Sequence, residues 1–154
     1  MGRQPPDGFL ENQGFPDVVF GDVEPINSHT LGWLDVYLDF ARQFKQITGE
    51  RIAFLQADLI WFDRWQPQLI EWHTKVRQAD IAYGIIIDGS SIDRNDLEWT
   101  QHAIDRYRLV MGNPNIKPES VVIGTWYKFP SKFLPESQAG TLASVVLQTS
   151  PRTM

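Results

Sequence analysis

The sequence has no cysteine and only three histidines among its 154 residues. A disulfide framework and a thiolate metal site are therefore excluded, and the redox state of the compartment is left open. The three histidines are His29, His73 and His102, and none has a second ligand at the spacing of a zinc site. We therefore expect no bound metal and no cofactor.

Long apolar runs and clusters of one charge are also missing. No segment approaches the roughly 18 apolar residues that a membrane-spanning helix needs, and the first residues lack the layout of a signal peptide. The formal net charge is −5 with both signs interspersed, which gives no basic surface for nucleic acid. We expect neither a nucleic-acid partner nor a membrane partner.

What the sequence does contain is four short apolar runs, each ending in a carboxylate or a tryptophan and each followed by a helical pattern. Continuous Val, Ile and Leu runs that alternate with helices are typical of a parallel sheet. The sequence thus predicts an α/β fold of four parallel β/α units. The predicted strands span residues 18–24, 52–58, 81–88 and 121–126.

Apolar residues at helical spacing predict the four intervening helices. Gly49 is a plausible end for the first, Asp63 a candidate cap for the second, and Asn95 with Glu98 forms a capping-box pattern at the third. The predicted helices span residues 33–47, 65–76, 95–111 and 141–148.

Three parts of the chain are expected: an irregular segment 1–16, four β/α units over 17–148, and a tail 149–154. A closed TIM-type barrel needs eight such units and roughly 250 residues. We therefore interpret the chain as half or a fragment of a TIM-type (β/α)8 barrel. The alternatives are a half-barrel that dimerises and a small open sheet.

Polar side chains at the strand ends are the candidate site residues. Side chains alternate across a strand, and a carboxylate held between sheet and helices without a partner would cost several kcal/mol. We therefore expect the strand-end acids to point away from the helices. The residues predicted to face the site are Asp22, Glu24, Gln56, Asp58, Asp88 and Trp126, with Trp61, Trp65 and Tyr127 in or near the following loops.

Carboxylates beside aromatic rings suit a carbohydrate. The acids can protonate a glycosidic oxygen and stabilise an oxocarbenium-like state, and apolar sugar faces pack on indole rings. A site for a hard divalent cation is the alternative. Structural roles are also open to these residue types. Acids at strand ends are often helix caps, and the helical spacing of Trp72 and Trp99 favours packing in the core.

Three segments carry a resemblance to a known family. Thr125–Pro130 (TWYKFP), continuing to Thr141 and Leu142, resembles the last β/α unit of glycoside-hydrolase-like barrels. Gly84–Gly89 is similar to the penultimate strand, and Gly21–Pro25 (GDVEP) to an acidic strand-end motif of the same superfamily. The resemblance covers about residues 17–148 and implies that the four strands correspond to the fifth to eighth of a barrel.

The resemblance implies a protein that hydrolyses or binds carbohydrate. Glu24 would be the general acid/base and Asp88 or Asp22 the second carboxylate, although the family usually has Glu at the end of the seventh strand. The residues expected to bind the sugar are Asp58, Trp61, Trp126, Tyr127 and Gln56, with Trp126 as the floor. A noncatalytic carbohydrate-binding or remnant barrel protein is the alternative.

A second and weaker resemblance concerns Asp22-Val23-Glu24, followed by a helical pattern and Thr48–Arg51. This arrangement is similar to barrel muramidases, which carry an Asp-x-Glu pair on a strand. Glu24 would then be the proton donor and Asp22 its partner. The later strands do not match the ending of that family.

Four strands cannot close a barrel, so the first and last strands would have unpaired edges. Open edges and uncovered apolar residues favour association. We therefore expect self-association through the open sheet edges. We also expect Trp126 to be partly exposed and Trp99 to be buried.

Overall fold

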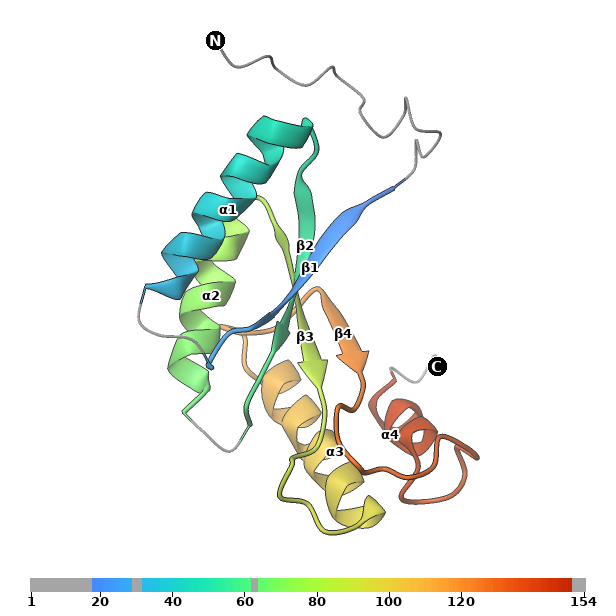
Figure 1. Cartoon of the computed structure of the whole chain (residues 1–154). Coiled ribbons are helices and arrows are strands. Elements are labelled where there is room, and N and C mark those ends of the chain that lie inside the picture. Colours follow the sequence, from blue (N-terminus) through green and yellow to red (C-terminus); the bar gives the residue numbers. More distant parts are fainter. Residues whose placement is uncertain (1–17, 29–31, 62–63, 151–154) are drawn as a thin grey trace.

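The computed structural model describes residues 18–28, 32–61 and 64–150. Strands and helices alternate along the chain (Figure 1). The elements are β1 (Phe20–Pro25), α1 (Trp33–Thr48), β2 (Ile52–Asp58), α2 (Gln66–Gln78), β3 (Ala82–Ile87), α3 (Asp96–Gly112), β4 (Ser120–Ile123) and α4 (Leu142–Thr149).

The four strands form one parallel sheet in the order β1-β2-β3-β4. Each strand therefore pairs with the next one along the chain, and a helix makes each connection. The predicted α/β class with four parallel units is confirmed. Because all strands run the same way, their carboxyl ends lie along a single edge of the sheet.

Local signals fix the helix ends. Gly49 follows α1 in the left-handed region with φ 82°, and its N–H donates to the carbonyl oxygen of Lys45, as expected of a C-terminal glycine. The Asn95 side chain accepts a hydrogen bond from the Glu98 N–H at 2.9 Å, which confirms the predicted cap of α3. The candidate cap Asp63 lies outside the described residues, and Trp65 occupies the N-cap position of α2 without a side-chain cap bond.

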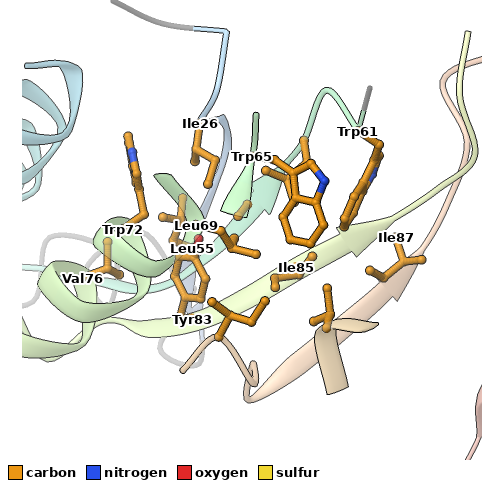
Figure 2. Packing of buried hydrophobic residues seen from close by; sticks show 14 of the residues in the cluster. Ile26, Leu55, Trp61, Trp65, Leu69, Trp72, Val76, Tyr83, Ile85 and Ile87 are labelled. Atoms are coloured by element: carbon orange, nitrogen blue, oxygen red, sulfur yellow. The ribbon is translucent and has the colours of Figure 1, made fainter. Parts of the chain in front are cut away.

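The hydrophobic core lies on one face of the sheet, where the helices cover it (Figure 2). Tyr83, Ile85 and Ile87 project from β3 into this core and are fully buried. Trp72 of α2 contacts Tyr37 of α1 with ring centroids 5.4 Å apart. Each large apolar side chain buried in this way stabilises the fold by about 1.5–3 kcal/mol. Trp72 and Trp99 are among the buried residues, as their helical spacing predicted.

The opposite face of the sheet is not covered by the helices. Val23, Phe54 and Val122 are 49%, 36% and 42% exposed there. In the middle of this face the Gln56 side chain reaches across β3 and its Nε2 donates to the Ser120 hydroxyl at 2.8 Å. Gly84 lies between them in register, and a Cβ at that position would overlap both side chains.

The orientation predicted for the acids of β1 is not the one observed. Asp22 pairs with Leu55 and Glu24 with Ala57, and these partners belong to the helix-covered core. Burial does not force these acids away from the helices, because β1 is an edge strand and its carboxylates remain only half-buried. The indole Nε1 of Trp33 in α1 donates to Glu24 Oε2 at 3.2 Å, which gives this acid a partner on the helix side.

Candidate functional site at the carboxyl edge of the sheet

Two acids from neighbouring strands meet at the carboxyl edge. Asp58 ends β2 and Asp88 directly follows β3. Asp58 is half-buried, whereas Asp88 is only 1% exposed. Within the described part of the chain no group hydrogen-bonds the Oδ1 atom of Asp88. Burying a charged carboxyl group whose oxygen has no hydrogen-bond partner costs free energy. The ionised form of Asp88 is therefore unfavourable at this position.

Burial, and after it the neighbouring charge of Asp58, raise the pKa of Asp88 to about 7, against the opposing effects of Arg106 and Trp61. Burial also raises the pKa of Asp58, although the Leu59 N–H opposes this. Two carboxyl groups that repel each other lose their protons in separate steps. Because Asp58 is the less buried acid, it ionises first and Asp88 retains its proton to near-neutral pH.

Arg106 of α3 fixes the end of β3. Its Nη1 donates to the backbone oxygen of Asp88 at 2.8 Å, and its guanidinium lies 5.3 Å from the ring centroid of Trp61, a cation–π arrangement. Burial lowers the pKa of Arg106, which the charge of Asp88 opposes. The indole N–H of Trp61 is close enough to lower the pKa of Asp88, but its geometry falls short of a hydrogen bond.

A third acid, Asp93, organises the loop that follows β3. Its side chain is fully buried. One oxygen accepts from the Ser90 N–H at 2.6 Å, and the other lies 2.7 Å from His102 Nδ1 of α3. The loop after Asp88 is thereby attached to α3 at two points, by Asp93 and by Arg106.

Aromatic side chains from the loop after β4 border the acids. The N–H of Gly124 donates to the Ile87 oxygen at 3.2 Å, so this loop begins beside Asp88. Burial, and after it the charges of Asp88 and Asp58, raise the pKa of the Tyr127 phenol. Trp126 is 68% exposed. This exposed fraction is larger than the partial exposure that was predicted for a tryptophan at the end of a strand.

The structure brings together four of the predicted site residues: Asp58, Asp88, Trp61 and Tyr127. Trp126 precedes Tyr127 in the chain and faces solvent. Trp61 and Trp65 are buried, and their rings pack edge to face with centroids 5.0 Å apart. Figure 2 shows both indoles among the packed core residues, so they belong to the core and are not open to a ligand.

The other predicted residues lie elsewhere. Asp22 and Glu24 belong to the helix-covered face of β1, and Gln56 uses its amide to bond Ser120 within the sheet. Sequence reasoning missed Arg106 and Asp93. Arg106 carried a signal, because it falls seven residues after Trp99 on the apolar stripe of its helix, where a charge needs a partner.

Two further findings concern the part of the chain that the structure describes. No group of three or more His, Cys, Asp or Glu residues is placed to hold a metal ion. None of its helices combines the length and the apolarity that crossing a membrane requires.

Comparison of the chain with known protein families, with curated proteins and with solved structures gave no match. The evidence for a function of this chain therefore comes from the residues at the carboxyl edge of the sheet.

Proposed function

We propose that the four β/α units form half of a TIM-type (β/α)8 barrel. Three observations support this: the strands follow one another in chain order, all are parallel, and the helices cover one face only. In such a barrel the uncovered face becomes the interior. The carboxyl edge, which carries Asp58 and Asp88, becomes the face where barrel enzymes hold their active sites.

On this fold we propose a carbohydrate site with glycoside-hydrolase-like chemistry. The observation that carries the proposal is the buried Asp88, whose pKa is raised to about 7 beside the less buried Asp58. Two carboxyl groups with separated protonation states are what glycosidic cleavage uses. Asp88 would donate its proton to the leaving oxygen, and Asp58, as the carboxylate, would stabilise positive charge on the sugar ring.

The exposed aromatic residues of the loop after β4 support a sugar as the ligand. The indole of Trp126 offers a flat apolar face, and Tyr127 adds a hydroxyl whose pKa responds to the charges of Asp88 and Asp58. Sugar rings combine apolar faces with hydroxyl groups, which matches this combination. Trp126 is therefore assigned to sugar stacking and Tyr127 to hydrogen bonding.

One observation favours a noncatalytic carbohydrate-binding protein as the second candidate. Asp88 is only 1% exposed, and a proton donor must come within about 3 Å of the leaving oxygen. If the carboxyl group stays covered when a sugar binds, the aromatic surface would bind without cleavage.

The test uses the full chain with a panel of neutral oligosaccharides. Binding is measured by tryptophan fluorescence, and cleavage by the release of reducing ends. If the chain is a hydrolase, Asp88→Asn should lower turnover by about 100-fold or more while sugar binding remains. Trp126→Ala should weaken sugar binding about tenfold. Leu109→Ala is the control, because Leu109 is an exposed apolar residue of α3 that is not part of the proposed sugar site.

Binding without turnover in the parent chain would support the second candidate. If no sugar in the panel changes the fluorescence and none is cleaved, the carbohydrate proposal is wrong. Equal losses of binding in Trp126→Ala and in Leu109→Ala would reject the assignment of Trp126.

A further inference from the structure

The sheet has two open edges. Within the described residues, β1 pairs only with β2 and β4 only with β3. Each edge strand presents unpaired backbone groups that another strand of the same direction could bond. Both edges also border the uncovered face, where Val23 of β1 and Val122 of β4 are exposed.

The helix next to the β1 edge carries an exposed apolar stripe. Val36, Phe40 and Ile47 of α1 are 53%, 46% and 66% exposed, and their spacings of four and seven place them along one side of the helix. This side is not the one that meets α2, because α1 contacts α2 through Tyr37 and Trp72. The stripe therefore flanks the sheet beyond β1.

The helix next to the β4 edge borders an apolar groove of about 550 Å³. All of its lining residues belong to the segment 133–150, that is, to α4 and the loop before it. Phe133, Leu134 and Leu147 contribute exposed side chains. The groove is the counterpart, on the β4 side, of the α1 stripe on the β1 side.

We propose that two copies of this chain associate about a two-fold axis into one closed, eight-stranded arrangement. Strand β1 of each copy borders β4 of the other, and the α1 stripe of each copy fills the α4 groove of the other. A second copy is the occupant because the chain carries both complementary surfaces and four of the eight strands that closure needs. The proposal concerns assembly and does not depend on carbohydrate chemistry.

The uncovered sheet face gives a further reason for closure. In the closed arrangement the exposed Val23, Phe54 and Val122 of both copies face a common interior. Association then removes three apolar surfaces from water together: the face, the stripe and the groove. Burial of apolar area is the main driving force for such an interface.

The experiment is sedimentation analysis of the full chain over a range of concentrations, with variants on the two flanks. Ile47→Glu places a negative charge on the α1 stripe, and Leu147→Lys places a positive charge in the α4 groove. Each variant alone should weaken association about tenfold or more, because both contacts of the two-fold pair carry the charge. Leu109→Lys is the control, since Leu109 is exposed on α3 and does not line the α4 groove.

Mixing the two variants is the decisive step. In a two-fold pair that contains one copy of each variant, one of the two contacts is unmodified. The other contact brings together the introduced carboxylate and the introduced ammonium group, which attract each other. The mixture should therefore regain dimer that neither variant forms alone, whereas the control dimerises like the parent. Circular dichroism confirms that each variant is folded.

Several results would overturn the proposal. A parent chain that stays monomeric at all concentrations excludes the dimer, whatever the variants do. Growth into larger polymers excludes two-fold closure. If the mixed variants stay monomeric while the parent dimerises, the pairing of α1 with α4 is wrong.

Discussion

Gly89 shows how a single residue sets the position of the site. A Cβ at this position would overlap the indole of Trp99, which is fully buried in the core. Because the ring is enclosed, it cannot move aside. The close approach of the backbone to Trp99 allows the chain to turn directly after Asp88, which keeps the carboxyl group at the edge of the sheet.

Gly89→Ala should therefore destabilise the protein by about 1–3 kcal/mol, as expected when a group is forced into a packed core. Gly124→Ala is the matched control, because a Cβ there meets nothing within 4 Å, and it should change stability by less than about 0.5 kcal/mol. Urea unfolding measures both. Equal effects would mean that Trp99 does not confine Gly89.

The raised pKa of Asp88 predicts a pH dependence of stability. The pKa rises from 3.8 to about 7 on folding, so between these values the folded state binds more protons than the unfolded state. The free energy of unfolding contributed by Asp88 therefore falls as the pH rises from about 4 to about 7. Asp88→Asn removes this contribution and retains the shape of the side chain.

We expect Asp88→Asn to become more stable, relative to the parent, at pH 8 than at pH 4. Urea unfolding at the two pH values measures the free energy of unfolding of both proteins. The other titrating groups, including Asp58, are present in both, so the difference between the proteins reports on Asp88. A constant difference between variant and parent would show that Asp88 ionises normally in the fold.

At the scale of the element, α3 connects the core to the site. It contributes Trp99 to the core, Arg106 to the backbone of Asp88, and His102 to Asp93. Its start is fixed by Asn95, which accepts the Glu98 N–H. A loosened first turn would therefore affect both the core and the loop after β3.

Asn95→Ala should cost about 1 kcal/mol, the usual effect of removing an N-cap. Gln101→Ala, at an exposed position within the same helix, should change stability by less than about 0.5 kcal/mol. Thermal unfolding distinguishes the two. Equal losses from the two variants would indicate that the cap is not used.

The elements themselves could be predicted because their signals are local. The apolar run 52–58 is β2 as expected, and Asn95 begins α3 as its pattern indicated. The orientation of β1 could not be predicted in the same way. It depends on whether a strand lies at the edge or the centre of the sheet, which is a property of the whole arrangement.

The same distinction applies to the candidate site. Asp58 and Asp88 could be identified because each ends an apolar run, and parallel strands place such ends together. Arg106 carried only the signal of a charge on the apolar stripe of α3. Its contact with Asp88 and the contact of Asp93 with His102 could not be predicted, because both depend on how α3 packs beside β3. Sequence patterns thus predicted the acids but not the groups that hold the surrounding backbone.

At the scale of the whole molecule, the chain combines one well-packed face with one uncovered face. Among the described residues, twenty-two buried apolar side chains form one continuous core. The other face leaves Val23, Phe54 and Val122 partly in contact with water. This asymmetry is what a half-barrel requires, and it is the reason that we expect the chain to pair with a second copy.

The bond from Gln56 to Ser120 across Gly84 also affects how the strands align. Because side chains alternate along a strand, a slip of β4 by one residue would bring Glu119 or Val121 opposite Gly84 in place of Ser120 and turn Ser120 toward the core. The bond between the Gln56 amide and the Ser120 hydroxyl would then be lost. This one hydrogen bond therefore favours a single register for β2, β3 and β4. A sheet in another register would be less stable during folding, even before the helices cover it.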